Sequence, residues 1–153
     1  MSELRGSTQR SRCSWLIVKE KPLPLSDGRI KGRRIAIRQN IPTLRKKADV
    51  LAEELGHYYT TVGRIIEQDS VSDRKQERIA RLWAYDKRIG LSGIVKGYKA
   101  HCRNRHELAE YLDVSEEFLK EALECYHEKY GLYVNFGDYT IMFEPTLIIF
   151  ERF

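Results

Sequence analysis

The chain has 153 residues, of which 42% are hydrophobic and 32% are charged, and its formal net charge is +5. This balance excludes an intrinsically disordered chain, and no apolar run approaches the ~20 residues of a membrane span. The three widely spaced cysteines form no C-x-x-C pair, and the N-terminus carries no apolar signal core. We therefore expect a cytoplasmic protein with reduced thiols and no membrane contact.

Charge is distributed unevenly along the chain. Residues 1–49 carry 13 Lys/Arg and 4 Asp/Glu, whereas residues 107–153 carry 3 Lys/Arg and 11 Asp/Glu. A basic N-terminal region could contact nucleic acid or an acidic partner. The sequence alone favours a basic surface without such a partner.

The chain begins with a polar stretch over residues 1–16, which predicts a disordered lead. Residues 17–153 are predicted to form a single α+β domain. The period-two patterns predict strands over residues 15–18, 29–38, 132–136, 139–143 and 147–150, with a tight hairpin at Lys31-Gly32. The helical patterns and capping signals predict helices over residues 43–62, 72–89, 91–102, 105–112 and 116–130.

The first predicted helix has two faces. Its apolar side is expected to carry Leu44, Ala48, Leu51, Leu55, Tyr58, Tyr59 and Val62. Glu53, Glu54 and His57 fall on the opposite side. Residues four apart lie one turn apart on the same face of a helix, so Glu53 and His57 could coordinate one metal ion.

This spacing is that of the zinc-helix motif H-E-x-x-H, with Glu53 in place of the first His. In the motif, the residue after the first ligand is the general base, which here is Glu54. On spacing alone, a solvated acidic helix face is the commoner explanation.

The second predicted helix carries Glu77, Ala80 and Ala84 along one side, at positions i, i+3 and i+7. Small alanines let another helix approach closely, and the carboxylate beside them could then reach across. The alternative is a surface glutamate among neighbouring basic residues.

Four stretches together resemble one family, namely Lys21–Ile37, Val50–Gly63, Arg74–Tyr85 and Glu107–Leu119. Through these stretches, residues 20–143 resemble the ImmA/IrrE metallopeptidases, in particular the short forms of phages and mobile elements. The resemblance covers about four fifths of the chain. The resemblance implies a zincin-like fold, in which a small sheet packs on an active-site helix and a second helix brings a third ligand. A helical region and C-terminal strands then follow.

The resemblance also implies a site. Glu77, followed by Ala80 and by Trp83-Ala84, matches the family's second-helix pattern and takes the role of third metal ligand. The metal ligands would be Glu53, His57 and Glu77, and Glu54 would be the catalytic base. One divalent metal is implied, namely zinc, with manganese or iron as alternatives. The implied activity is endopeptidase cleavage of a protein substrate, a repressor-type regulator of a mobile element or of a stress response.

Two features depart from the family pattern. Glu53 stands where many members have His, so two acidic ligands and one neutral ligand would cancel the charge of a divalent ion. This harder ligand set makes manganese or iron more plausible beside zinc. The family also usually begins with a helix, which residues 1–16 do not resemble.

Two rival functions remain open at this stage. A non-catalytic member of the same fold would only bind a regulator. Residues 104–130 also have a helix-turn-helix pattern, which could indicate DNA binding. Over residues 116–124 the would-be recognition helix carries Glu116, Glu117, Glu121 and Glu124, with only Lys120 against them. Phosphates would repel this surface, so nucleic acid is not the expected partner of that region.

Overall fold

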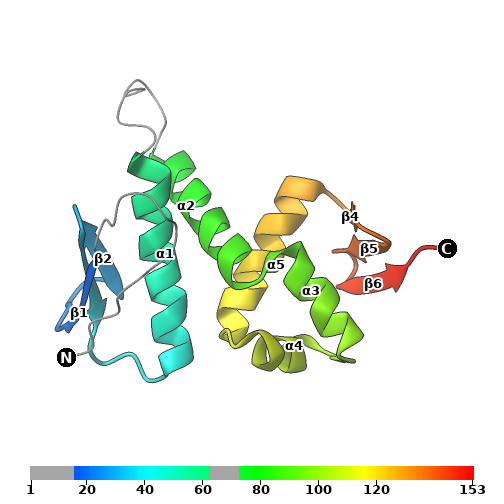
Figure 1. The fold of residues 1–153 in the computed structure, drawn as a ribbon, viewed down its shortest axis with the longest axis horizontal. Coiled ribbons are helices and arrows are strands. Elements are labelled where there is room, and N and C mark those ends of the chain that lie inside the picture. The colour runs from blue at the N-terminus through cyan, green and yellow to red at the C-terminus, as the bar shows by residue number, and fades with distance from the viewer. Residues whose placement is uncertain (1–15, 63–72) are drawn as a thin grey trace. The chain divides into compact units, whose positions relative to one another are not determined.

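The computed structural model describes residues 16–62 and 73–153. Contacts divide the chain into two compact units, residues 1–84 and residues 85–153, called the N-terminal and C-terminal units below. Each combines helices with a small sheet, which confirms the α+β class (Figure 1). Nearly all of the polar lead predicted over residues 1–16 lies outside the described residues. The single domain expected over residues 17–153 stays a prediction.

The sheet of the N-terminal unit has three strands in the order β1-β3-β2. Strand β2 (Gly28–Lys31) pairs antiparallel with β3 (Arg34–Arg38), and Gly32 at φ 59° forms the tight turn between them. This confirms the predicted hairpin, since a positive φ favours glycine. Strand β1 (Ile17–Lys21) pairs parallel with β3 and extends three residues beyond its predicted end at residue 18.

Helix α1 (Leu44–Val62) covers one face of this sheet. The core between them consists of five buried residues, Val18, Ile35, Ile37, Ile41 and Val50, with Ile30, Leu51 and Leu55 packed around them. Each strand alternates, so the residues between these apolar positions point away from the core. The sheet therefore has one face against α1 and one outer face.

Of the seven residues predicted for the apolar side of α1, Leu51 and Leu55 are the two among the described residues of this core, and two of the others are mainly exposed. Leu44 is 82% exposed, and Tyr59 is 52% exposed. Leu44 is the first residue of α1, and helical side chains point towards the N-terminus, where no further turn covers it. Tyr59 instead stacks on Trp83 of helix α2 (Asp73–Arg88), with ring centroids 5.2 Å apart.

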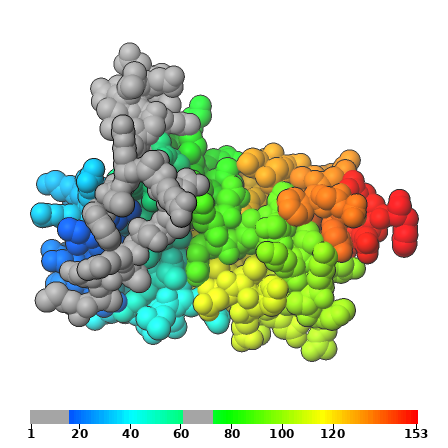
Figure 2. All heavy atoms as spheres, viewed as in Figure 1, coloured from blue at the N-terminus to red at the C-terminus, as the bar shows by residue number. Residues whose placement is uncertain are grey.

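The C-terminal unit contains three helices followed by three strands. The helices are α3 (Gly90–Lys99), α4 (Arg105–Leu112) and α5 (Glu116–Tyr130). Strands β4 (Tyr133–Phe136), β5 (Tyr139–Met142) and β6 (Ile148–Glu151) form an antiparallel sheet in that order. The largest fully buried side chains of the C-terminal unit are Ile94, Val114, Leu119, Tyr126 and Ile141. The strands of this sheet (orange to red) appear at the surface in Figure 2. Among their side chains, those of Tyr133, Ile148 and Phe150 are exposed.

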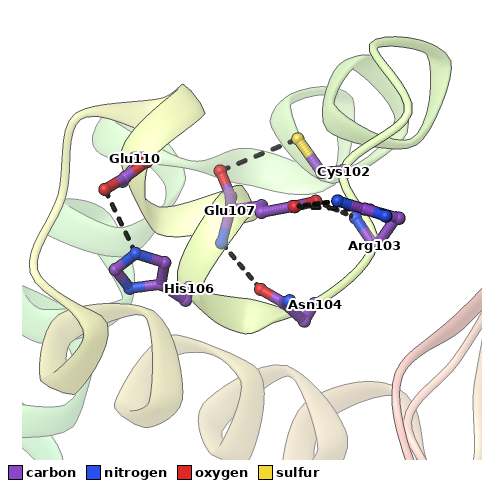
Figure 3. Close-up of polar contacts among 6 residues, drawn as sticks. All are labelled: Cys102, Arg103, Asn104, His106, Glu107 and Glu110. Carbon is purple, nitrogen blue, oxygen red and sulfur yellow. Dashed lines mark hydrogen bonds and ion pairs between the residues drawn. The ribbon is translucent and has the colours of Figure 1, made fainter.

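Capping side chains set the starts of α4 and α5, which match the predicted bounds. Asn104 Oδ1 accepts a hydrogen bond from the Glu107 N–H at 2.9 Å, and Ser115 Oγ accepts one from the Phe118 N–H at 3.1 Å. The Glu107 carboxylate in turn accepts a hydrogen bond from the Arg103 N–H (Figure 3). The bonds from the Glu107 and Phe118 N–H groups satisfy donors that the first turn of a helix leaves without a backbone partner.

Two of the three histidines of the C-terminal unit, His106 and His127, contact acidic side chains. His106 lies 3.2 Å from Glu110 and 2.6 Å from Glu116, and the hydrogen bond to Glu116 and both negative charges raise its pKa. His127 Nε2 lies 3.2 Å from Glu144 Oε1. Both are thus accounted for as surface histidines.

No helix within the described ranges has the length and apolar character that crossing a bilayer requires. Neither Cys102 nor Cys125 forms a disulfide bond within the described residues.

Candidate functional site

Helix α1 places the three residues of the E-E-x-x-H pattern on consecutive turns. The helix begins after Thr43, whose Oγ1 accepts a hydrogen bond from the Lys46 N–H at 3.1 Å. From this start, Glu53, Glu54 and His57 follow in the third and fourth turns, and all three are half-buried. The predicted one-turn relation of Glu53 and His57 is therefore present.

Gly56 brings helix α2 close to this pattern. A methyl group built on Gly56 would lie 2.3 Å from the carbonyl oxygen of Ala80, which leaves no room for any side chain there. Ala80 and Ala84 are both fully buried. The small residues thus let the two backbones approach, as the alanines of the second helix predicted.

This close approach places Glu77, one turn before Ala80, beside His57. His57 Nε2 lies 3.1 Å from Glu77 Oε2, and the two side chains are 29% and 44% exposed. The other oxygen of Glu77 accepts a hydrogen bond from Arg81 Nε at 3.1 Å. Glu77 is therefore oriented by Arg81 and directed at His57, rather than free at the surface.

Glu54 lies in the same region and has an altered acidity. Burial, and then the negative charge of Glu77, raise the pKa of its carboxyl group from 4.5 to about 7. A methyl group on Gly28 of β2 would lie 2.7 Å from Glu54 Oε1 and 2.7 Å from Val50 Cγ1. Only glycine at position 28 therefore lets the edge strand lie directly against this carboxyl group.

His57 and Glu77 are suitably spaced to share a divalent ion. Two donors of one tetrahedral zinc ion, each about 2.1 Å from it, are about 3.4 Å apart, close to the spacing of Nε2 and Oε2 here. Imidazole and carboxylate are ligands that zinc, manganese and iron all accept. Arg81 would supply the outer hydrogen bond that orients the Glu77 carboxylate.

The third predicted ligand is not placed with this pair. Within residues 16–62 and 73–153, no group of three or more His, Cys, Asp and Glu side chains is arranged to hold a metal ion. Glu53 as a ligand therefore stays a prediction. The structure brings two of the four predicted site residues into contact, His57 and Glu77, and Glu54 is near enough for the charge of Glu77 to raise the pKa of its carboxyl group.

Sequence reasoning misses two residues of this site. Gly28 stands in a Ser-Asp-Gly stretch that indicates only turn chemistry, although the residue makes room for Glu54. Arg81 stands four residues after Glu77, a spacing that favours an ion pair on one helix face and could have identified it.

The raised pKa of Glu54 predicts that this residue destabilises the metal-free protein at alkaline pH. Because the folded-state pKa is above 4.5, the folded state disfavours the charged form, and stability falls as the pH rises from about 4.5 through about 7. Glu54→Gln should thus raise the free energy of unfolding by about 1–2 kcal/mol near pH 8. This is less than ~1.4 kcal/mol for each unit of the pKa shift would give in total, because solvent reaches part of the site. Near pH 5 the gain should fall to about a quarter of its value near pH 8.

Urea unfolding of both proteins in the presence of a chelator measures this difference. The control is Glu117→Gln, an exposed position on α5, which should leave stability unchanged at both pH values. An equal effect of Glu54→Gln at about pH 5 and about pH 8 would show that charge at position 54 is not its cause.

No protein-family model matches the sequence, and no characterised protein or solved structure with significant similarity was found.

Proposed function

We propose that the protein is a metal-dependent endopeptidase with a zincin-like arrangement of its N-terminal unit. The observation that carries this proposal is the 3.1 Å contact between His57 on α1 and Glu77 on α2, with the Glu54 carboxyl group beside them. The spacing seen in the sequence and the contact made by the fold have His57 in common. The resemblance to the ImmA/IrrE metallopeptidases supports the same conclusion.

In this proposal, His57 and Glu77 hold a divalent ion, and Glu53 is the third ligand. Zinc is the expected metal, and manganese or iron are the alternatives favoured by two carboxylate ligands. The bound ion would supply Lewis acidity for peptide hydrolysis. Arg81 keeps the Glu77 carboxylate turned towards His57 through its own hydrogen bond.

Glu54 is the general base of the proposed reaction. It takes a proton from the attacking water as the new C–O bond forms at the peptide carbonyl carbon. It then delivers that proton to the leaving amine as the C–N bond breaks. In the metal-free protein, burial and the charge of Glu77 raise the pKa of this carboxyl group to about 7. A bound cation would lower it and so favour the ionised form that a base requires near neutral pH.

The substrate class is proposed from the resemblance alone. A repressor-type regulator of a mobile element or of a stress response would be the protein substrate. A non-catalytic member that only binds such a regulator is the rival, since Glu53 departs from the usual ligand. The raised pKa of Glu54 favours the catalytic version, because a binding surface has no need of a half-buried carboxyl group.

DNA binding by the helix-turn-helix pattern is not favoured. Helices α4 and α5 are joined by a short turn, as that motif requires. However, Glu116, Glu117 and Glu124 are exposed on α5, and they would repel phosphates.

Cleavage of a proteome-derived peptide library tests the proposal, because such a library samples many cleavage sequences at once. The full-length protein is loaded with zinc, manganese or iron in separate samples, and new peptide ends are identified by mass spectrometry. We expect metal-dependent products that 1,10-phenanthroline suppresses and its non-chelating 1,7-isomer does not. Absence of products with all three metals would overturn the peptidase proposal in favour of regulator binding.

A further inference from the structure

The outer face of the β1-β3-β2 sheet carries an unusual concentration of positive charge. On this face the register places Ala36 of β3 between Lys19 of β1 and Arg29 of β2. In the adjacent row, Arg34 lies next to Lys31, and Lys21 follows two residues after Lys19. All five cationic side chains are exposed, and they are called the basic sheet face below, namely Lys19, Lys21, Arg29, Lys31 and Arg34.

The acidic residues of the same sheet region are paired with other cations, one of which, Arg38, lies on this face beside Lys21 in the register. Glu20 lies 2.8 Å from Lys47 of α1, and Asp27 lies 3.2 Å from Arg38. Within the part of the chain that the structure describes, no carboxylate pairs with any cation of the basic sheet face. Five positive charges thus repel one another without an internal counter-charge, which costs free energy unless an anion binds.

The basic sheet face is hollowed rather than flat. A cavity of about 290 Å³ is lined by its five cations together with Ile17, Ile35 and Ala36. The small Ala36 side chain at the centre lets the surrounding longer side chains form a rim. Flexible cationic side chains around a shallow depression can contact several negative charges of one polyanion at once.

The magnitude of the charge separates two possible occupants. Side chains on one face of a strand recur about every 6.7 Å, so the three rows of the face span about 13 Å. An acidic peptide lying in extended form would present only about three carboxylates over that length. Duplex DNA carries about one charge per 1.7 Å of its axis, or about eight over the same length. The five cations exceed the charges that such a peptide supplies, whereas a duplex can supply a phosphate to each of them.

The side-chain types favour a duplex over a single strand. Proteins that bind single strands supply aromatic side chains on which unpaired bases stack. The residues that line the hollow include no aromatic side chain, and none of them is Asn, Gln, Ser or Thr, which could read base edges. Lys and Arg can also reach guanine, but the major groove admits a helix or a two-stranded ribbon and not the face of a three-stranded sheet. The cations of this face can therefore reach the sugar–phosphate backbone, and in a duplex the bases are already stacked.

We propose that the basic sheet face binds the phosphate backbone of duplex DNA without sequence preference. The sequence alone favoured a basic surface without a partner. The pairing of Glu20 and Asp27 with other cations, and the hollow around Ala36, are what the structure adds. The face lies on the side of the sheet opposite α1, so this binding does not depend on the proposed peptidase site.

Fluorescence anisotropy of the full-length protein with a labelled duplex of about 20 base pairs, titrated with salt, tests this proposal. The test variant is Lys19→Gln/Arg29→Gln/Arg34→Gln. The control is Arg74→Gln/Lys75→Gln/Lys120→Gln, which removes the same net charge from exposed positions on α2 and α5. We expect the test variant to lose about tenfold or more in affinity near 50 mM salt, and its log–log salt slope to fall by about 3. The control should bind nearly as the unmodified protein does.

Three results would overturn the proposal. One is equal loss in the test and control variants, which would indicate a non-local charge effect. Another is binding of polyglutamate, or of a single-stranded oligonucleotide, as tight as that of the duplex at equal charge concentration. The third is absence of duplex binding near 50 mM salt. Circular dichroism verifies that both variants are folded, and cleavage of short peptides by the test variant should be unchanged.

Discussion

Gly56→Ala is expected to destabilise the protein by about 2–4 kcal/mol, although alanine is the better helix former by about 1 kcal/mol. The added methyl group would lie 2.3 Å from the Ala80 carbonyl oxygen. That contact is with backbone, which cannot rotate away as a long side chain can. Helix α2 must therefore shift from α1, and the shift should separate Glu77 from His57. Urea unfolding followed by circular dichroism gives the change in free energy.

Gly93→Ala in α3 is the matched control for this substitution. Gly93 is also a buried helical glycine, but its added methyl group would meet the end of the Leu112 side chain at 3.1 Å. A flexible side chain can give way, so we expect a change within about 1 kcal/mol. If Gly56→Ala were as mild as Gly93→Ala, the close approach of α1 and α2 would not be what positions Glu77.

Glu54→Gln is expected to lower peptide hydrolysis by about 10²- to 10⁴-fold. The amide has nearly the same shape as the carboxyl group and fits beside Gly28, but it cannot take a proton from water. Metal content should be unchanged, because Glu54 is not a proposed ligand. Initial rates on a peptide identified from the library, compared with those of Glu117→Gln, measure the loss.

The same Glu54→Gln variant should be inactive and, near pH 8, more stable. These two effects have opposite signs, so partial unfolding cannot explain the loss of activity. A Glu54→Gln protein that hydrolysed the peptide at the normal rate would remove Glu54 from the mechanism.

Much of the fold could be predicted because its signals are local. Asn104 and Ser115 cap their helices through their own side chains, so the starts of α4 and α5 were predicted to the residue. Gly32 marks the β2–β3 turn because it alone tolerates its backbone conformation without strain. The parallel pairing of β1 with β3 was not predicted, since it joins segments separated by a hairpin and leaves no periodic pattern of its own.

The site was predictable only in part for a similar reason. The one-turn spacing of Glu53 and His57 follows from the helix period. The contact of His57 with Glu77 depends on how closely α2 approaches, and this in turn depends on Gly56 and Ala80 together. The raised pKa of Glu54 depends on burial and on the charge of Glu77, neither of which is a property of the E-E-x-x-H spacing.

Metal content tests the proposed centre most directly. The full-length protein is purified without chelator, and its metal is measured by mass spectrometry beside Glu77→Ala and the control Glu117→Gln. We expect about one divalent ion per chain in the unmodified protein and in the control, and a 10- to 100-fold weaker affinity, or near-complete loss, in Glu77→Ala. Equal and negligible metal in all three proteins, even after addition of zinc, manganese or iron, would contradict a metal site shared by His57 and Glu77.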